Sequence, residues 1–377
     1  MPTRELICDN GLGSPLESER WIATSHGREV GMYYCGLDVS RKSTHVHIED
    51  GQGKRVEHRV VPTTPEGLES ALENYFARGL RVAVEAGGST GWIHDLLREL
   101  GARVHVVHPT KVKWIAASKK KTDRVDARLL AHLLRINGLP EAVHMPTRQS
   151  REVRRLLRAR RQLVQIRTRL INVVRSVLEQ QQVNLRAGAL GSRKGWKALY
   201  DLPLLPGIRD IVSAYDATVA ATTAAITTLE TQLAIRAQAD KRVAQLQTIP
   251  GVGPLTAQTV VAAIDRVHRF ANARKLVGYI GLAPSVRSSG ERVEYGRITK
   301  QGRSEVRAVL VQAAHALLAI KRDTAKPLQY WCARVARRRG KKTAIVALAR
   351  KLLTIAFYLL RDGTTFDPTR VRITAAA

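Results

Sequence analysis

Short runs that alternate apolar and polar residues dominate the first third of the chain. They predict β-strands over residues 33–39, 44–49, 54–61, 81–85 and 103–107. Helical segments are predicted over residues 65–77, 91–100 and 109–136. The order β-β-β-α-β-α-β-α predicts an antiparallel hairpin followed by right-handed crossovers to parallel strands. This α/β order is typical of a ribonuclease-H-like fold.

A heptad pattern follows from about residue 150. Apolar side chains alternate at steps of three and four, which predicts a helical seam of about three heptads. Its members are Leu156, Ala159, Leu163, Ile166, Leu170, Val173 and Val177. A second helical stretch around residues 226–233 can fold back on the first, after the Gly- and Pro-containing segment 188–207. An intramolecular hairpin and an oligomer contact explain this seam equally well.

The third pattern is a Gly-Pro turn before an apolar helix, Ile249-Pro250-Gly251-Val252-Gly253-Pro254. It has the form of a helix-hairpin-helix loop, in which Gly251 and Gly253 allow a tight turn and backbone N–H groups face a phosphate. A purely structural turn is the alternative. The rest of the chain to residue 365 reads as helices.

Composition excludes several classes of protein. The 377 residues are 44% apolar, enough to bury a core in more than one domain, so general disorder is excluded. Three distant cysteines make neither a disulfide framework nor a C-x-x-C metal site. The longest apolar run, 344–360, contains Arg350 and Lys351, so we expect no membrane segment. Without a signal-like start, we expect a cytoplasmic protein.

Charge then indicates the partner. Lysine and arginine number 62 against 32 acidic residues, a net +30. Such a surplus needs a polyanion, and nucleic acid is the obvious candidate; a basic surface kept for solubility is the weaker alternative. The cations concentrate over residues 321–351, where we predict a phosphate-binding strip. Its densest part holds Arg337, Arg338, Arg339, Lys341 and Lys342.

Two carboxylates close apolar strands at the same predicted sheet edge. Asp38 ends the first strand and Glu85 the fourth, and these strands are expected to be neighbours. Asp123 and Asp126 are three residues apart and project from one side of a helix. In the alternative interpretation Thr122 or Asp123 is only a helix N-cap, and Asp126 is a first-turn acid favoured by the helix dipole. Four converging carboxylates would repel unless divalent cations lie among them, which predicts a Mg²⁺ or Mn²⁺ site for phosphoryl transfer.

A second candidate lies in Arg287-Ser288-Ser289-Gly290, followed by Arg297, Lys300, Arg303 and Arg307. We predict a polar loop in a helical region, where a serine could be a nucleophile and the cations could bind phosphates nearby. A plain turn has the same composition.

Taken in order, these motifs resemble the DEDD transposases of the IS-one-ten group of bacterial insertion sequences. The likeness covers residues 32–365 and rests on Gly36-Leu37-Asp38, Val84-Glu85-Ala86 and Thr122-Asp123-Arg124-Val125-Asp126-Ala127. It rests also on the Gly-Pro turn, the serine loop and the segment 298–302.

The resemblance implies a RuvC-like domain that binds Mg²⁺ through Asp38, Glu85, Asp123 and Asp126. It implies a nucleophile at Ser289, the serine directly before the glycine, with Ser288 as the alternative. It further implies a covalent serine–DNA intermediate on donor and target DNA, a guide (bridge) RNA that pairs with both, and a homo-oligomer such as a dimer or tetramer.

We therefore expect five parts. They are a loose extension (1–31), a RuvC-like DEDD domain (32–145), a helical coiled-coil region (146–245), a mostly helical transposase domain with the helix-hairpin-helix and serine loop (246–365), and a tail (366–377). Two alternative functions stay open: a RuvC-like junction nuclease in which Ser289 is only a turn residue, and a non-catalytic nucleic-acid binder.

Overall fold

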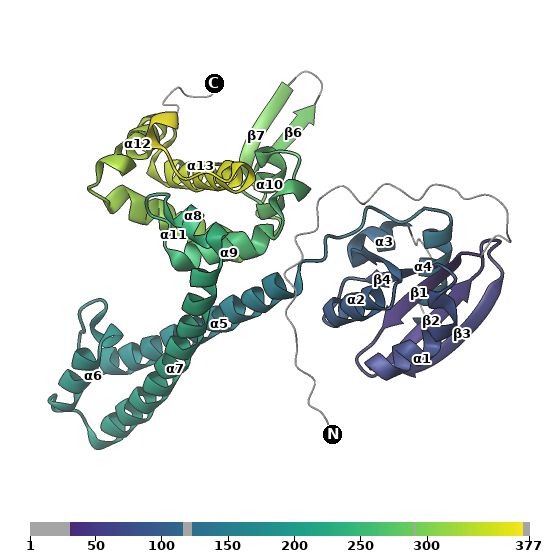
Figure 1. The fold of residues 1–377 in the computed structure, drawn as a ribbon. Coiled ribbons are helices and arrows are strands. Elements are labelled where there is room, and N and C mark those ends of the chain that lie inside the picture. The colour runs from purple at the N-terminus through teal and green to yellow at the C-terminus, as the bar shows by residue number, and fades with distance from the viewer. Residues whose placement is uncertain (1–30, 116–122, 290–291, 372–377) are drawn as a thin grey trace, which may run out of the picture. The chain divides into compact units, whose positions relative to one another are not determined.

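The computed structural model describes residues 31–115, 123–289 and 292–371. Contacts divide the chain into two compact units, Met1–Met145 and Pro146–Ala377. Each unit has its own buried core. Figure 1 labels the helices and strands of each unit.

The N-terminal unit is built on a five-stranded mixed sheet. Its strands lie in the order β3-β2-β1-β4-β5. They are β1 (Tyr33–Val39), β2 (Ser43–Glu49), β3 (Arg55–Pro62), β4 (Leu80–Glu85) and β5 (Arg103–Val107). The first three pair antiparallel, whereas β1, β4 and β5 run parallel. This confirms the predicted strands, nearly to the residue, and the predicted order of pairing.

Helices cover both faces of this sheet. Helices α1 (Pro65–Phe76) and α2 (Thr90–Glu99) pack on the side that carries Leu37 and Val84. Helices α3 (Pro109–Ile115) and α4 (Asp123–Arg135) belong to the opposite side, with Ala83 and Val107. Alternate side chains of a strand point to opposite faces of a sheet. Because helices cover both faces here, β1 and β4 are apolar on both sides along most of their length.

A long helical hairpin opens the second unit. Helix α5 (Arg148–Gln180) packs along α7 (Pro206–Ala239), and η1 (Ala189–Gly191) and α6 (Arg193–Tyr200) close the far end (Figure 1). The ion pairs Arg160–Glu230 and Arg236–Glu152 show that the two helices run antiparallel. The intramolecular interpretation of the predicted seam therefore holds within this chain.

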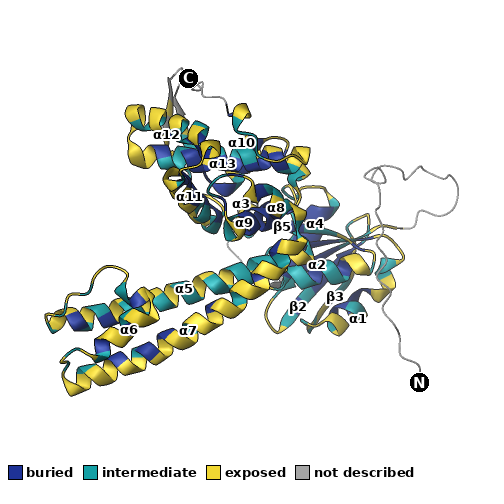
Figure 2. Ribbon diagram, turned by 60° about the vertical axis from the view of Figure 1, so that its left-hand side comes forward, coloured by how far each residue is buried: buried dark blue, intermediate teal, exposed yellow. Residues whose placement is uncertain are grey.

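The predicted seam is wrong in phase near the end of α5. Ile166 and Val173 are 44% and 41% exposed, whereas Val174 and Leu178 are fully buried. A straight α-helix has 3.6 residues per turn and drifts from a strict heptad, so the buried stripe moves round the helix. Exposed outer faces on both helices are visible in Figure 2.

The remainder is a helical bundle around one central helix. It comprises α8 (Lys241–Gln247), α9 (Pro254–Ile264), η2 (Val267–Arg269), α10 (Ala273–Ile280), α11 (Ser304–Ala319), η3 (Asp323–Ala325), α12 (Lys326–Arg339), α13 (Lys341–Asp362) and η4 (Pro368–Arg370). By length and composition α13 alone among the described helices could span a membrane. Its Leu352, Leu353 and Phe357 are instead buried in the core of this bundle.

The segment predicted as a polar loop is a β-hairpin. Strands β6 (Pro284–Ser289) and β7 (Arg292–Ile298) pair antiparallel and form a separate two-stranded sheet. Two glycines close its base: a Cβ on Gly281 would lie 1.9 Å from the Gln301 carbonyl oxygen, and one on Gly302 would lie 2.1 Å from that of Tyr279. Both have positive φ, so only glycine fits here without strain.

Candidate active site

Two of the predicted acids lie where the parallel strands β1 and β4 end. We call this end of the sheet the acidic edge. Strands β1 and β4 pair in parallel with Leu37 opposite Val84. Asp38 and Glu85 each follow by one residue, so they occupy matching positions on the same face. Both side chains are half-buried. The neighbouring strands expected from the sequence are confirmed.

Helix α4 brings a third acid to this face. It crosses β1 at Gly36, where an added Cβ would lie 1.9 Å from the Ala127 carbonyl oxygen and 2.7 Å from the Ala131 nitrogen. Gly36 and Asp38 share a face because they are two residues apart. Asp126 directly precedes Ala127 and is half-buried.

The direction of α4 places its first turn toward the acidic edge. At the other end of the helix, Arg135 contacts Glu49, and Glu49 lies opposite Tyr34 at the start of β1. The helix therefore runs antiparallel to β1, with residues 123–126 at the end of the strand that carries Asp38. Asp123 begins α4, but its side chain lies outside the described residues.

The donor set fits a hard divalent cation in its chemistry, because all four predicted ligands are carboxylate oxygens. Over the described side chains, which leave out Asp123, no group of three or more His, Cys, Asp and Glu lies close enough to hold a metal ion. The acids whose side chains the structure describes, Asp38, Glu85 and Asp126, thus share one edge of the sheet without forming a group of three close enough to hold a metal ion.

A row of polar residues beneath α4 escaped the sequence analysis. His45 lies opposite Asp38, and His47 and Glu49 follow on the same face of β2. His47 Nε2 is 3.3 Å from Glu49 Oε1, and Arg135 Nε is 3.5 Å from Glu49 Oε2. Burial lowers the pKa of His47, although Glu49 opposes this shift. The alternation His45-Val46-His47-Ile48-Glu49 was the available signal.

Thr90 fixes the chain just after Glu85. Its buried hydroxyl donates to the Glu85 carbonyl oxygen at 2.7 Å and accepts from the Gly87 N–H at 2.7 Å. The turn after β4 is therefore held in place where the strand delivers its carboxylate. Sequence reasoning did not assign this threonine a role.

The serines lie on the β6–β7 hairpin of the second unit. Ser289 pairs with Arg292 and Ser288 with Val293, next to the hairpin tip. The side chains of Arg287, Ser288 and Ser289 lie outside the described residues. The acids and the serines belong to different units, and each set is placed only within its own unit.

The predicted phosphate-binding cations near the hairpin fall into two groups. Arg297 and Lys300 are exposed. Arg303 donates to Tyr279 Oη at 3.2 Å and to Glu305 at 3.0 Å, and Arg307 donates to the Ile280 carbonyl at 2.8 Å. Arg303 and Arg307 thus also tie α11 to α10.

Tyr279 lies among three arginines. Arg269 stacks 4.4 Å from its ring centroid, and Arg303 donates to its hydroxyl. Burial alone would raise the pKa of this tyrosine, but the hydrogen bond from Arg303 and the charges of Arg303, Arg269 and Arg154 lower it overall. Positive potential is therefore high where α10 meets the base of the hairpin.

The Gly-Pro turn joins α8 to α9, and its two glycines differ. Gly251 has a φ of +83°, and a Cβ there would lie 2.6 Å from the Ala313 carbonyl oxygen of α11. Gly253 has open space around it and caps α9. A pocket of about 380 Å³ adjoins the turn and has Arg322 in its wall. Gly251 is thus required for packing, and Gly253 is the glycine on the open side.

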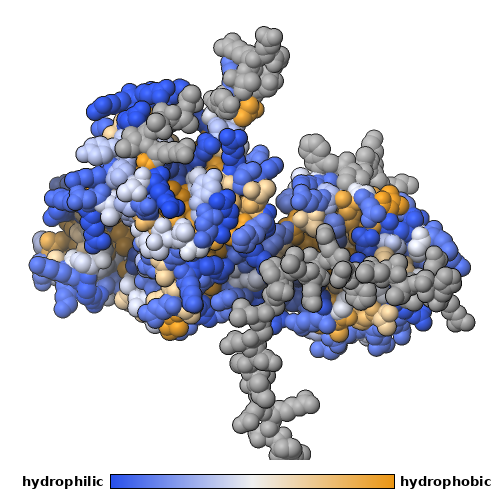
Figure 3. Space-filling model, turned by 45° about the horizontal axis from the view of Figure 1, so that its top comes forward, coloured by the Kyte–Doolittle hydropathy of each residue, from blue (hydrophilic) through white to orange (hydrophobic). Residues whose placement is uncertain are grey.

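The predicted basic strip spans the junction of two helices. Arg337, Arg338 and Arg339 end α12, and Lys341 and Lys342 begin α13 after Gly340; all five cations are exposed. A hydrophilic surface dominates the face of the molecule in Figure 3.

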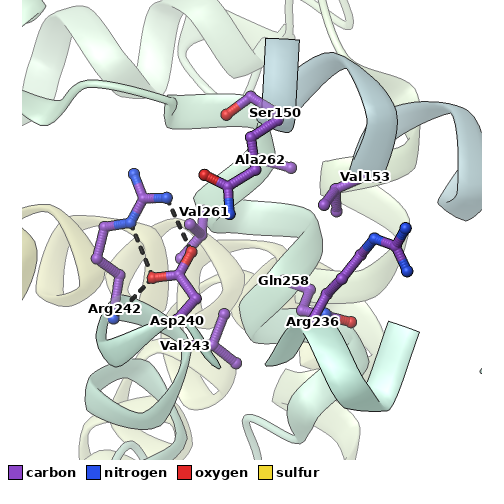
Figure 4. A pocket seen from close by; sticks show the side chains of 10 residues that line it. Ser150, Val153, Arg236, Asp240, Arg242, Val243, Gln258, Val261 and Ala262 are labelled. Carbon is purple, nitrogen blue, oxygen red and sulfur yellow. Dashed lines mark hydrogen bonds and ion pairs between the residues drawn. The ribbon is translucent and has the colours of Figure 1, made fainter. Parts of the chain in front are cut away.

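One small pocket is not a substrate site. It lies among α5, α7, α8 and α9, and Figure 4 shows Asp240 bound to Arg242 inside it. Hydrogen bonds from Arg242 to Asp240 raise the pKa of this arginine. The cavity measures about 20 Å³, room for about one water molecule.

A mixed sheet with carboxylates at the ends of its parallel strands, joined to a basic helical unit, is a combination that suits an enzyme acting on nucleic acid. Comparison with known proteins agrees: residues 35–182 match a family described as transposase, and residues 243–329 match the transposase IS116/IS110/IS902 family. The chain belongs to the IS110 family of insertion-sequence transposases. Members of this family catalyse DNA strand cleavage and transfer.

Two relatives match most of the chain, and a third matches one third of it. It is 31% identical to the transposase for insertion sequence element IS1111A of Coxiella burnetii, over 76% of this chain and 79% of that protein. It is 28% identical to a probable family 20 transposase of Pseudomonas aeruginosa, over 88% and 98%. A pilin gene-inverting protein of Moraxella bovis is 34% identical over 33% of this chain and 39% of its own length.

Proposed function

We propose that this transposase recombines DNA through a covalent bond between Ser289 and a DNA strand, with help from Mg²⁺ held by Asp38, Glu85, Asp123 and Asp126. The observation that carries the proposal is the register of β1 and β4, which sets Asp38 beside Glu85 at the edge that α4 reaches. A sheet of this order, with its acids at the ends of strands, supports a RuvC-like N-terminal domain.

The acids supply the metal site. DEDD transposases use divalent metal ions. Carboxylates alone suit Mg²⁺ or Mn²⁺, which when bound would stabilise the charge on the attacking and leaving oxygens. The protein's own contribution is orientation: Thr90 holds the backbone at Glu85, and the contact between Gly36 and Ala127 holds α4 against β1.

Ser289 supplies the nucleophile. Its Oγ forms a bond to the scissile phosphorus, the bond from that phosphorus to a deoxyribose oxygen breaks, and the proton lost by serine balances the proton gained by the departing oxygen. Attack by the hydroxyl of another strand then releases the serine and rejoins the DNA. Phosphodiester bonds are conserved throughout, which suits recombination between donor and target DNA.

The surrounding residues support this chemistry. Exposed Arg297 and Lys300 lie on or beside β7 and would bind phosphates, as would Arg287, while Arg303 and Arg307 add charge at the hairpin base. The related pilin gene-inverting protein is named for a DNA rearrangement. Guidance by a bridge RNA is part of the proposal, because a net charge of +30 suits the binding of two nucleic acids. Assembly into a dimer or tetramer completes it.

Trapping tests the nucleophile. We expect the full-length protein, with its DNA, RNA and Mg²⁺, to give a protein–DNA adduct that survives denaturant. The Ser289→Ala variant should give none, and the matched Ser288→Ala variant should keep it. Adduct in Ser289→Ala but not in Ser288→Ala would move the role to Ser288.

The same assay addresses the metal and the rival nuclease. Asp38→Asn and chelator should each abolish both adduct and cleavage, whereas Glu73→Gln, an exposed acid on α1, should leave them intact. Hydrolytic cleavage that persists in Ser289→Ala would instead support a RuvC-like nuclease in which water attacks. Cleavage unaffected by Asp38→Asn would refute the acidic site.

A further inference from the structure

A basic groove in the C-terminal unit is lined mainly by α5 arginines that the proposed chemistry does not use. It has a volume of about 630 Å³ and is lined by residues of α5, of α9, which packs against α5, and of the start of α11. The α5 side is lined by Arg154, Arg155, Arg158, Arg160 and Arg161. Arg303 and Ser304, at the start of α11, line the other side.

These arginines differ in what already binds them. Arg154 donates to the carbonyl oxygens of Ala262 and Ala263, and Arg160 pairs with Glu230. Both therefore have structural roles. Arg155, Arg158 and Arg161 are exposed, and no described acid or carbonyl oxygen pairs with them. Their guanidinium groups are available to a ligand.

Their spacing suits a chain of phosphates. Successive positions three residues apart on a helix rise by about 4.5 Å, so the three span about 9 Å along α5. A strand of duplex DNA advances about 3.4 Å along the duplex axis per nucleotide, so this span matches two to three steps between successive phosphates, or about three to four phosphates.

The groove also lacks anions to balance its charge. Glu305 is the only acid among its described lining residues, and Arg303 already binds it at 3.0 Å. Burial, together with the nearby charge of Arg303, lowers the pKa of Arg154 to about 10. The N-terminal end of the 16-residue helix α11 adds positive potential. A bound polyanion would relieve this repulsion.

We propose that this groove binds the phosphate backbone of DNA, with Arg155, Arg158 and Arg161 as the phosphate contacts. DNA is the ligand because the family acts on DNA. No aromatic residue is among the described lining residues, so bases have no stacking surface there and binding should not depend on sequence. The inference rests on family membership and needs no assumption about Ser289.

Salt-dependent binding tests it. Affinity of the full-length protein for a fluorescent DNA duplex, and for an RNA of the same sequence, is measured at several salt concentrations with chelator present, so that no strand is cut. Replacing all three arginines by glutamine should weaken DNA binding about tenfold or more and reduce the slope of log K against log salt by about 2 to 3.

The matched control removes the same charge elsewhere in this unit. The control variant combines Arg169→Gln, Lys194→Gln and Lys197→Gln. These three residues are exposed and lie outside the groove, so the control should change the salt slope much less. As a check on wild-type protein, DNA should protect Arg155, Arg158 and Arg161 from phenylglyoxal, read by mass spectrometry. Equal slopes in the two triple variants, a loss confined to RNA, or no protection would each overturn the proposal.

Discussion

Gly36 shows how a single residue positions the candidate active site. It lies in the middle of β1, where a larger side chain would normally strengthen the strand. Its missing side chain lets the backbone of α4 approach at Ala127 and Ala131. Asp126 comes to the acidic edge through this contact. The sequence motif Gly36-Leu37-Asp38 therefore contains both a proposed metal ligand and the space into which α4 packs.

Substitution of Gly36 should separate packing from chemistry. The added methyl group of Gly36→Ala must displace α4, so we expect a loss of about 1 to 3 kcal/mol in the free energy of unfolding and a large drop in DNA cleavage. Gly51→Ala is the control, because its Cβ meets nothing within 4 Å. Denaturant titration and a cleavage assay measure the two effects. Wild-type stability in Gly36→Ala would contradict the close contact.

His47 makes the stability of this unit depend on pH. Burial lowers its folded-state pKa below the ordinary 6.5, so between those two values the unfolded chain binds more protons. Stability from this group is therefore complete above about pH 6.5 and is lost as the pH falls.

Urea unfolding followed from pH 7 to pH 5 measures this effect. We expect the wild-type curve to fall more steeply than that of His47→Gln. His108→Gln, which replaces an exposed histidine between β5 and α3, serves as the control and should keep the wild-type slope. Parallel curves for the wild type and His47→Gln would exclude this histidine as the cause.

At the scale of secondary-structure elements, the sequence predicted an element correctly where one hydrophobic period persisted along it. The five strands of the first sheet could be predicted because each is a short run of apolar or alternating residues bounded by polar or turn residues. Glu85 and Asp38 stood out because each ends such a run. The β6–β7 hairpin could not be predicted in this way, since Ser288 and Ser289 favour turns and Val286 is 56% exposed.

Contacts between distant segments explain the other omissions. The sequence gives no distance between β2 and α4, so the buried group of His47, Glu49 and Arg135 was invisible until the sheet register was known. Likewise, the arginines of α5 cover several faces of the helix. Only packing against α9 and α11 shows which of them line a groove.

The far end of the α5–α7 hairpin depends on one buried acid. Asp216 of α7 accepts from Arg193 and from Tyr200, both in α6. We expect Asp216→Asn to destabilise this end by about 1 to 3 kcal/mol, because it removes the charge that both donors use. Hydrogen exchange of α6 should accelerate, and exposed Asp210→Asn on the same helix should not change it. Unchanged exchange in Asp216→Asn would refute this role.

Charge is distributed unequally over the whole molecule. Residues 146–377 contain 42 lysines and arginines against 14 acidic residues, whereas residues 1–145 contain 20 against 18. Nearly all of the net +30 thus belongs to the second unit. The first unit carries the candidate metal ligands, and the second carries the surfaces suited to phosphates.

The lysines of the basic strip lie where the dipole of their own helix, α13, disfavours positive charge. Lys341 and Lys342 lie in the first turn of α13, which has no acidic residue, although the dipole of a helix disfavours cations there by about 0.3 to 1 kcal/mol each. Selection for helix stability alone would favour acids at these positions. A bound phosphate would reverse the balance, because the helix end and the lysines then attract the same anion.

Neutralising the α12 part of this strip should therefore remove local phosphate contacts that cations elsewhere on the molecule do not replace. We expect Arg337→Gln, Arg338→Gln and Arg339→Gln together to lower the magnitude of the salt slope for DNA binding by about 2 to 3, with cleavage chemistry intact at saturating DNA. The control triple removes exposed Arg98, Arg103 and Lys111 from the first unit. If net charge alone governed binding, the two triples would shift the slope equally. A shift confined to the strip variant would assign the attraction to a local surface at the junction of α12 and α13.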